Sequence, residues 1–516
     1  MFEWFSRLRN RGAVQATPAP LGRIAARYDA AQITDENKRH WAWADGLSAR
    51  SANSPDVRQR LRKNSRYETA NNSIANGMVQ TLANDVVGTG PRLQMKLRSK
   101  PANQRIEALH RDWSAAIDFA GKLRTRRRAR CVDGEGFAKL ITNKRLPLPV
   151  KLDLSLIEAE MVTTPWLGQL DRNKVDGIDF DSDGNPVTYH ILKDHPGDVG
   201  PLTLQAVPHD ARYVLHSFRR DRPGQVRGIP EITPALPLFA LRRRFMLATI
   251  MAAEGAANYT AILHTEHPGI GVPDDVPVFE SFDQERNSYM AIPRGWDLKQ
   301  LASEHPADTF EMFDRAIIRE MSRCILMPYL IAAGDSSASN FASAQLDTLG
   351  YWSAIDIERD CDLAWDCSRI HREWLLEAEA SGVIDIDGDE MERISRGECL
   401  WEWQWDAHRH IDVVKKENAR QTRLQNFMAS FDTEFAADGL DCETEWQKNA
   451  DRLGITIEDY RRKVSEKLFA IPGQGNVADP ETDDSEDSAK PSARKRSAVV
   501  PQRTAARNRV PAGGKA

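Results

Sequence analysis

The chain has 516 residues and a mass of 58.1 kDa, a length that predicts several subdomains rather than one compact core. Hydrophobic residues make up 41% of it, which is enough for a folded chain. Its 70 lysines and arginines nearly balance 75 acidic residues, for a net charge of −5. This balance argues against a protein that clamps DNA tightly through its phosphates, because such a protein needs a strongly basic face.

The cysteines are scattered and form no C-x-x-C pair, so they are expected to be reduced and mostly buried thiols of a cytosolic protein. No apolar run is as long as a membrane span, and residues 1–11 lack a signal-peptide core. We therefore expect no membrane partner. The six cysteines are Cys131, Cys324, Cys361, Cys367, Cys399 and Cys442.

The first elements in chain order are an arm and two helices. Arginines and prolines in residues 1–21 predict a mobile arm. Ser54 and Pro55 have the cap and first-position chemistry of a helix start. Apolar residues at helical spacing predict a second helix over 103–118. Short apolar runs between Pro, Gly and Asp clusters then predict strands over 136–218.

A strand-like segment at 211–218 leads into a helix over 233–259, roughly 40 Å long at 1.5 Å per residue. Thr233 is expected to cap this helix and Pro234 to occupy its first position. Five prolines break the residues at 264–306, which predicts a small irregular module inserted between two helices.

The remaining elements are mostly helical. A helix over 308–326 carries one apolar stripe and is ended by Pro328. Residues 331–340 are small and polar and predict a flexible loop. The later predictions are a long helix at 341–380, a strand with one aromatic face at 400–405, helices at 411–469 and a disordered tail from 472.

The most informative segment is Arg222–Pro230, RPGQVRGIP, a turn between a strand and a helix start. Pro223 and Gly224 supply a fixed φ followed by a permissive one. The segment matches almost letter for letter a signature of lambda-type bacteriophage portal proteins. Similarity to this family runs in the same order from about Tyr28 to Leu453. The matching blocks are 28–31 with Trp41 and Trp43, 61–72, 84–90, 177–189, 340–344 and 403–419.

This resemblance implies an α+β, mostly helical portal fold with wing, stem, clip and crown regions, assembled as a ring with a central channel. Each subunit would supply helices to a shared barrel through a heterologous interface that closes. Carried onto this chain, the regions are a flexible arm (1–27), wing (28–232), stem helices (233–262 and 307–327), clip (263–306), tunnel loop (328–341), a long helix that returns into the wing (342–410), crown (411–470) and a disordered tail, acidic and then basic (471–516).

The resemblance also implies a portal protein of a phage or prophage, located at one capsid vertex of the virion and in the host bacterial cytoplasm during assembly. Double-stranded DNA would pass through its ring, by resemblance a dodecamer, without enzymatic activity, catalytic residues, metal or cofactor. The implied protein partners are the terminase large subunit, capsid and scaffold proteins, and head-completion or tail-connector proteins. Terminase and the connector proteins would dock on the clip, where Asp283, Glu285 and Arg286 are candidates.

The tunnel loop is expected to line the DNA channel. It is small and polar, with one acid and no lysine or arginine, so it would repel phosphates and let DNA slide. Without the resemblance, the same composition would describe an ordinary surface connection. The candidate channel residues are Asp335, Ser336, Ser337, Ser339 and Asn340.

A basic cluster occupies residues 122–130. Two interpretations are open: contact with phosphates or with an acidic neighbouring subunit, or a solvated helix face paired with Asp133 and Glu135. Six cations this close repel one another unless something neutralises them. The cations are Lys122, Arg124, Arg126, Arg127, Arg128 and Arg130.

Several acidic and metal-ligand patterns are weaker. Residues 179–184 resemble the first half of a calcium loop, but the twelfth position is His190, and a β-turn at 183–186 fits better. The acids at 385–390 favour a solvated turn. Cys399, His408 and His410 lack a fourth zinc ligand.

Two other classes of function fit the sequence less well. A packaging nuclease would need ATP or metal motifs, but no G-x-x-x-x-G-K-[ST] run is present, and Asp133, Glu135 and Lys139 lack the usual nuclease spacing and favour a helix or turn surface. A DNA-binding regulator would need a compact basic domain, whereas the basic, patternless stretch is the tail.

Overall fold

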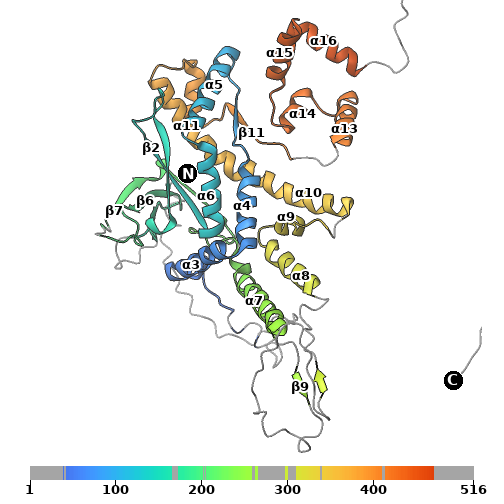
Figure 1. The fold of residues 1–516 in the computed structure, drawn as a ribbon. Helices are drawn as coiled ribbons and strands as arrows, with labels where there is room; N and C mark the ends of the chain where they lie inside the picture. Colours follow the sequence, from blue (N-terminus) through green and yellow to red (C-terminus); the bar gives the residue numbers. More distant parts are fainter. Residues whose placement is uncertain are drawn as a thin grey trace, which may run out of the picture.

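The computed structural model describes residues 39, 42, 44–164, 173–200, 203, 205–258, 262–264, 297–299, 310–337, 340–408 and 413–469. The α+β class is confirmed, with helices predominating over small antiparallel sheets (Figure 1). The arm at 1–27, most of the clip, the tail and Ser339 lie outside the described residues. None of the helices in the described ranges combines the length and apolarity needed to cross a bilayer.

The helical body is built around a shared apolar core. Trp113, Leu82 and Trp374 are each no more than 3% exposed and belong to one continuous cluster. The predicted start at Pro55 is confirmed, although the Ser54 side chain makes no cap hydrogen bond. The helices of the body are α2 (Ala49–Ala52), α3 (Pro55–Asn71), α4 (Ser73–Val87), α5 (Lys100–Ala116), α6 (Phe119–Asp133) and α11 (Ala364–Ala380).

Two antiparallel sheets pack beside this body (Figure 1). In the first, Ala138 pairs with Leu156 on one side and Leu215 on the other. The predicted strand at 211–218 begins instead with a 3-10 turn. The first sheet has the order β3 (Leu152–Ile157), β2 (Glu135–Thr142), β8 (Val214–Phe218); the second has the order β4 (Lys174–Val175), β5 (Ile178–Phe180), β6 (Pro186–Leu192), β7 (Ala206–Asp210), and the 3-10 turn is η3 (Ala211–Tyr213).

The segment that resembles a calcium loop is a hairpin turn between β5 and β6. The Asp181 carboxylate accepts hydrogen bonds from the backbone N–H groups of Asp183 (2.9 Å) and Asn185 (2.8 Å). Gly184 has a φ of 88°, which glycine adopts without strain. A β-turn is present, but it spans Asp181–Gly184 rather than 183–186: the backbone N–H of Gly184 donates to the carbonyl of Asp181 at 3.3 Å, and the backbone N–H of Asp181 donates to the carbonyl of Asn185 at 2.9 Å.

The long helix predicted from Thr233 begins differently. Thr233 lies within the short 3-10 helix η4 (Thr233–Ala235), and its hydroxyl donates to the carbonyl of Pro230 at 2.6 Å. It is therefore not the cap of α7 (Leu236–Asn258), as the sequence had suggested. After α7, the short strands β9 (Ile262–His264) and β10 (Asp297–Lys299) pair, and α8 (Phe310–Arg323) runs beside α7.

The predicted loop at 331–340 was wrong in its first part. Tyr329 to Ala333 form the short helix α9, which starts after Pro328 and ends where Gly334 takes a left-handed φ of 65°. Pro328 thus opens α9, while α8 has already ended at Arg323.

The long helix predicted at 341–380 is continuous but not uniform. It consists of α10 (Phe341–Ile357), the π-helical segment η5 (Glu358–Leu363) and α11. Arg359 within the π segment donates to the carbonyls of Asp85 (2.8 Å) and Val86 (2.9 Å) at the end of α4. The irregular turn is therefore anchored to the body.

The C-terminal part confirms a strand and further helices. Trp401 and Trp403 alternate along β11 (Trp401–Gln404), which pairs with β1 (Arg92–Met95), and both indole N–H groups donate to Ser368 Oγ. The acids at 385–390 are not all solvated, because Glu390 is buried and accepts from the backbone N–H of Arg98. The remaining helices are α12 (Gly388–Ser395), α13 (Val413–Gln425), α14 (Phe431–Ala437), α15 (Cys442–Leu453) and α16 (Ile457–Leu468).

Candidate functional site

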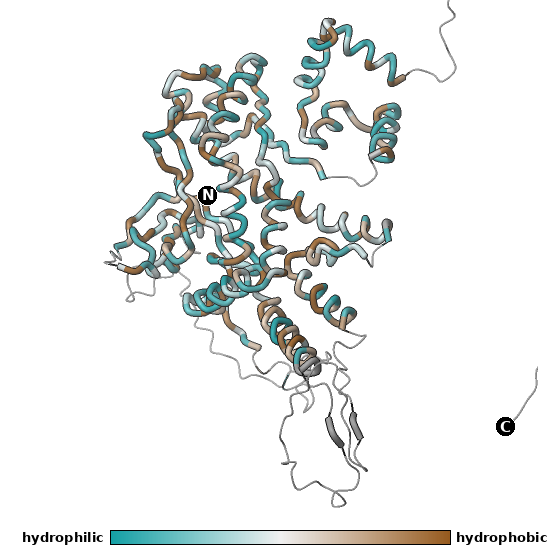
Figure 2. The backbone as a smooth tube through the Cα atoms, in the orientation of Figure 1, coloured by the Kyte–Doolittle hydropathy of each residue, from teal (hydrophilic) through white to brown (hydrophobic). Residues whose placement is uncertain are grey.

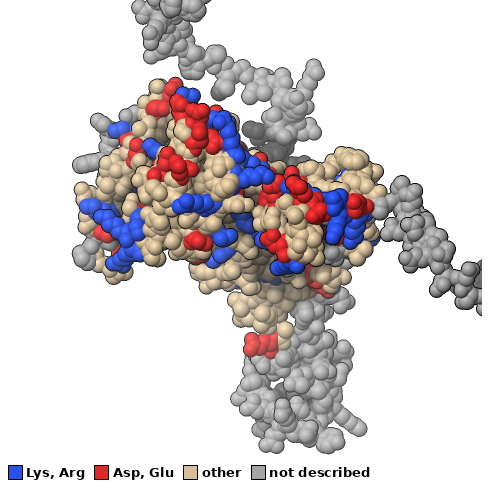
Figure 3. All heavy atoms as spheres, turned by 90° about the horizontal axis from the view of Figure 1, so that it is seen from above, with Lys and Arg blue, Asp and Glu red and all other residues tan. Residues whose placement is uncertain are grey.

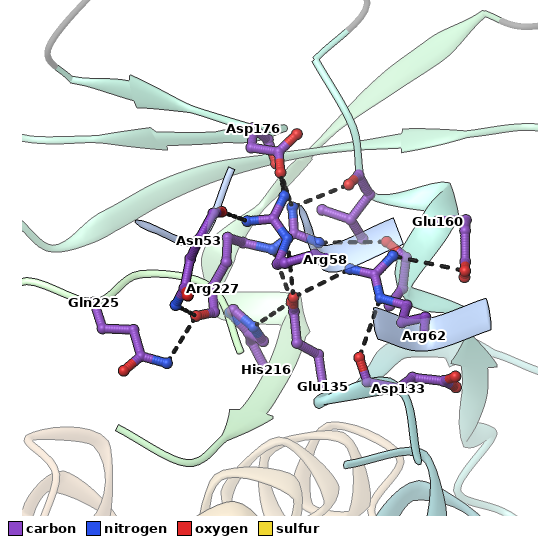
Figure 4. Close-up of polar contacts among 12 residues, drawn as sticks. Asn53, Arg58, Arg62, Asp133, Glu135, Glu160, Asp176, His216, Gln225 and Arg227 are labelled. Atoms are coloured by element: carbon purple, nitrogen blue, oxygen red, sulfur yellow. Dashed lines mark hydrogen bonds and ion pairs between the residues drawn. The ribbon is translucent and has the colours of Figure 1, made fainter. Parts of the chain in front are cut away.

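The signature segment lies in a buried ion-pair network (Figure 4). Arg227 is 1% exposed; its Nε donates to Glu135 Oε2 at 2.7 Å, and its Nη1 donates to the carbonyl of Val162 at 3.1 Å. Gly228 follows, where an added Cβ would collide with the carbonyl oxygen of Gly134. The segment is therefore held tightly against β2 and the chain that follows β3.

Glu135, at the start of β2, is the centre of this network. Arg62 of α3 donates to its Oε1 at 3.4 Å, and His216 of β8 lies 3.1 Å from its Oε2. Burial alone would raise the pKa of Glu135, but Arg227, His216 and Arg58 outweigh it and hold the pKa well below its usual range. Burial, helped by Arg227, lowers the pKa of Arg58 to about 9. The network thus joins α3 and two strands to the signature segment.

The expected surface position of Asp133 and Glu135 was wrong. Both carboxylates are buried, and Asp133 accepts from Arg66 Nε at 2.6 Å. Lys139 lies on β2, several residues from this cluster of charges. Because guanidinium groups surround the two acids, the three residues are not arranged as the metal site of a nuclease.

The basic cluster of α6 is likewise turned inward. Arg126 pairs with Asp366 at 2.7 Å, and both Arg127 and Arg130 pair with Glu231 at 2.9 Å. All three arginines are buried. Arg127 also pairs with Glu358 of η5. Neither interpretation drawn from the sequence holds for these three arginines, because their partners are acids of the same chain, on η5, on α11 and directly after the signature segment, rather than phosphates or Asp133 and Glu135.

The rest of the cluster is divided between the chain itself and solvent. Lys122 pairs with Asp153, and Arg124 donates to the carbonyl of Gly88 at 2.7 Å. Arg128 is exposed and has no ion pair with another described residue. Of the four residues suggested for phosphate or subunit contact, Arg128 thus stays a candidate, and Arg124 is half-buried.

The suggested zinc ligands are not brought together. His408 bonds to Asp356 at 2.7 Å and stacks on Trp352, whereas the Cys399 sulfur lies 3.9 Å from an Arg372 nitrogen. His410 lies outside the described residues.

A different group, Glu158, Glu160 and His195, has ligand atoms close enough for a metal. Arg66 already bridges both carboxylates, at 3.2 and 2.9 Å. The backbone N–H of Gly197 donates to His195 Nδ1 at 3.0 Å, so the proton of the neutral ring resides on Nε2, which faces Glu158. The group is therefore an ion-pair cluster rather than a cation site.

Helices α7, α8 and α10 expose large apolar side chains in the single chain. Figure 2 shows hydrophobic residues along α7 and α8. Past Phe239, no described side chain of α7 is buried. The helix contacts α8 through Phe245, which stacks on Phe310, and through Arg242, whose Nε lies 2.7 Å from Asp314. The exposed apolar residues are Leu241, Leu247, Ile250 and Met251 on α7, Met312 and Phe313 on α8, and Leu346 and Leu349 on α10.

The described tunnel-loop residues lie between α9 and α10. The Asp335 carboxylate accepts from the Tyr329 hydroxyl at 3.0 Å and from the backbone N–H of Ser337 at 2.9 Å. Hydrogen bonds from Ser337 and Tyr329 lower the pKa of Asp335. Ser336 and Ser337 are exposed, and Asn340 caps α10 by accepting from the backbone N–H of a residue in its first turn.

A row of arginines on α8 was not predicted from the sequence. Arg315, Arg319 and Arg323 follow one another at intervals of four residues, which places them on one face of the helix. The guanidinium carbons of Arg315 and Arg319 lie 5.6 and 5.5 Å from the centre of the Tyr329 ring. The spacing is visible in the sequence, but the apolar stripe of the same helix is the stronger pattern.

Comparison with protein families places the chain in a class of phage proteins. A family model described as phage portal protein, lambda family, matches residues 36–359, which is more than half of the chain. The chain belongs to this family.

Solved structures of gene transfer agent particles resemble the fold more distantly. A chain from the "neck of empty GTA particle computed with C6 symmetry" is 15% identical, with a TM-score of 0.44, covering 78% of this chain and 94% of that one. A chain from the "neck of native GTA particle computed with C12 symmetry" is 13% identical, with a TM-score of 0.42, covering 75% and 94%. A chain from the "virion of native gene transfer agent (GTA) particle" is 14% identical, with a TM-score of 0.41, covering 77% and 93%.

Proposed function

We propose that this portal-family chain assembles into a closed ring, a dodecamer, around a channel at one capsid vertex, through which double-stranded DNA is packaged and ejected. The observation that carries this proposal is the exposed apolar surface of α7, α8 and α10. Met312 is 68% exposed and Leu346 is 72% exposed in the single subunit. Large apolar side chains gathered on neighbouring helices mark a surface that another protein covers.

Burial of such side chains favours a ring made of identical subunits. Removing one large aliphatic side chain from water stabilises an assembly by roughly 1.5–3 kcal/mol. When the covering surface belongs to a second copy, the contact is heterologous, and it closes only at a defined rotation. Paired α7 and α8 helices from each subunit would then form the channel wall.

The short segment between α9 and α10 is proposed to line the channel. It begins at Gly334 and carries Asp335, Ser336 and Ser337 before Asn340 caps α10. Small polar side chains with a repeated acid give phosphates no firm hold, which suits DNA that has to slide.

The protein partners are part of the same proposal. The clip at 263–306, with Asp283, Glu285 and Arg286, would dock the terminase large subunit and later the head-completion or tail-connector proteins. Capsid and scaffold proteins would surround the ring in the virion, after assembly in the host cytoplasm. The role is structural rather than enzymatic, and the buried charged clusters around Glu135 and Glu231 are engaged in ion pairs that hold the fold.

Native mass spectrometry and negative-stain images of the purified full chain test the ring. We expect closed rings, and we expect Leu247→Asp with Ile250→Asp to yield free subunits, because the charges would be buried at the interface. Val187→Asp, a matched change at another exposed apolar side chain on β6, should leave rings intact. A stable monomer of the unmodified chain over a wide concentration range would exclude this function.

Two variants test the loop and the clip in a packaging assay. Asp335→Arg with Ser337→Arg should leave rings intact yet slow packaging or impair DNA retention and release, since the loop would then attract phosphates. Charge reversal at Asp283 and Glu285 should also leave rings intact but block packaging at the motor. Wild-type DNA content in either variant would remove that segment from its proposed place.

A further inference from the structure

The feature that the portal role leaves unexplained is the arginine row of α8. Arg315, Arg319 and Arg323 occupy positions four residues apart, so they follow one another at about 6 Å along the helix axis. Three like charges in such a row destabilise a helix slightly, by a few tenths of a kcal/mol per pair. A row of this kind therefore needs either partners or a ligand.

The last two members of this row have no acidic partner. Arg315 pairs with Glu311, one turn away, but Arg319 and Arg323 are exposed and make no ion pair with any residue in the described ranges. Elsewhere on the two stem helices, Arg242 pairs with Asp314 and Arg243 pairs with Glu68 of α3. Arg319 and Arg323 of α8 are thus unpaired, whereas Arg242 and Arg243 of α7 have acidic partners. Arg244 of α7 is also exposed and makes no ion pair with a described residue.

Tyr329 holds this row in place. Its ring lies against both Arg315 and Arg319, and its hydroxyl donates to Asp335 at 3.0 Å. An arginine over an aromatic face keeps its planar fork ordered while its N–H groups remain free. Arg315 and Arg319 are therefore ordered beside the segment that links α9 to α10, in the position where the proposed function places the channel, and Arg323 lies one turn further along the same face.

We propose that Arg319 and Arg323, supported by Arg315 and Tyr329, bind the phosphates of duplex DNA inside the ring. This inference rests on the proposed function, because only a ring brings the row of every subunit around one duplex. The guanidinium fork matches the phosphate oxygens, and binding releases counterions from the DNA. The row would alternate with the acid of the tunnel loop, Asp335, so the channel would contain one attractive and one repulsive belt.

Such belts are compatible with movement of the DNA. Exposed contacts to phosphate are weakened by salt and carry no sequence information, so a duplex exchanges them as it slides. The upper face of the subunit, in contrast, shows basic and acidic side chains interspersed (Figure 3). An unneutralised row on the stem is therefore a local feature rather than part of a generally basic surface.

The test measures binding of a fluorescein-labelled duplex of about 30 base pairs to assembled rings, by anisotropy at about 50 mM NaCl. Arg319→Ala with Arg323→Ala should lower the affinity about tenfold, and Arg319→Lys with Arg323→Lys should restore most of it, because the interaction is largely electrostatic. The matched control is Arg60→Ala with Lys63→Ala, which removes two exposed cations of α3 and should change the affinity less than about twofold.

The outcomes distinguish failure of this inference from failure of the proposed function. If rings of the double alanine variant bind DNA as tightly as wild-type rings, the arginine row does not bind DNA. The proposed ring function would be unaffected by that result. Loss of rings in that variant would show that the row pairs with a neighbouring subunit, which also overturns it. If the wild-type chain forms no rings, the proposed function fails, and this inference fails with it.

Discussion

The basic cluster on α6 and the arginine row on α8 have opposite surroundings. On α6, Arg126, Arg127 and Arg130 are buried against carboxylates of η5, of α11 and of Glu231, the residue after the signature segment. On α8, Arg319 and Arg323 face solvent without an acid among the described residues. Local density of positive charge therefore does not identify a phosphate-binding surface. What separates the clusters is whether the fold brings acids to them.

The two clusters also differ in what they do for stability. A buried ion pair gains little over an apolar contact, yet removing one partner leaves a charge that burial strongly penalises. The α6 cluster thereby joins segments that are distant in sequence. The exposed row contributes little to folding, since exposed charges are screened by water and salt. It remains available to a ligand.

The largest expected effect comes from a substitution that breaks the buried cluster. Glu231→Gln leaves Arg127 and Arg130 without their shared carboxylate, so the free energy of unfolding should fall by about 3–5 kcal/mol. Urea denaturation followed by tryptophan fluorescence measures this change. Arg319→Ala should shift the same transition by less than about 0.5 kcal/mol. An equal loss of unfolding free energy in the two variants would show that the two clusters do not differ in their contribution to stability.

Low pH should reduce the stabilisation that Glu231 gives to the buried cluster of α6. Burial would raise the pKa of Glu231, but Arg127 and Arg130 outweigh it and hold the pKa below its ordinary value of 4.5. A carboxylate whose pKa is lower in the folded chain stabilises the fold fully above its unfolded-state value and progressively less as pH falls below it. The stability difference between the wild type and Glu231→Gln should be constant above about pH 5 and shrink below it.

Constancy of that difference down to strongly acidic pH would contradict this assignment. The measurement is a series of urea transitions for both proteins across the pH range. Using the difference removes the contribution of other titrating groups, such as His110, whose pKa burial lowers to about 3.

Salt should weaken DNA binding by the exposed row but leave the stabilisation by the buried cluster almost unchanged. The logarithm of the DNA affinity of wild-type rings should fall linearly with the logarithm of salt concentration. In Arg319→Ala with Arg323→Ala, the slope should be shallower by about one for each phosphate that the variant no longer neutralises. The stability difference caused by Glu231→Gln should hardly change over the same range, because buried pairs are poorly screened. Identical slopes for variant and wild type would place the DNA contacts elsewhere.

The smallest effect concerns Tyr329. Tyr329→Phe removes the hydrogen bond to Asp335 but keeps the ring on which Arg315 and Arg319 pack, so stability should fall by no more than about 1 kcal/mol. DNA affinity should stay within about twofold of the wild type. Tyr329→Ala, which removes the ring, should weaken binding more than Tyr329→Phe. The same anisotropy assay compares the two, and equal affinities would mean that the ring does not order the row.

Much of the fold could be predicted from local patterns. Apolar spacing placed the helices at 103–118 and 308–326 to within a few residues, and alternating tryptophans placed β11. Such signals depend on neighbours up to four residues away, which the sequence displays directly. The signature segment, together with the other matching blocks in the same order, was enough to indicate the portal family that the family model confirms.

The errors arose where the backbone departs from these regular patterns. Tyr329–Ala333 forms a helix that overlaps a stretch predicted as loop. The sequence did not indicate this helix because five residues are too few to display a helical period. Thr233 resembles a helix cap, but the chain makes a 3-10 turn there. The π segment η5 could not be predicted from the spacing of apolar residues. Its acid Glu358 pairs with Arg127 of α6, a contact between distant parts of the sequence.

The sequence by itself thus determined the family, most of the long helices and the presence of the basic cluster at 122–130. Only the tertiary structure decided which cluster is buried and which is free. Arg126 meets Asp366, 240 residues further along the chain, and Arg130 meets Glu231, 101 residues further. Attraction between charges depends on their distance in space, and chain folding sets that distance. The charge of Arg319 was equally visible in the sequence, but its lack of an acidic partner among the described residues became visible only in the folded chain.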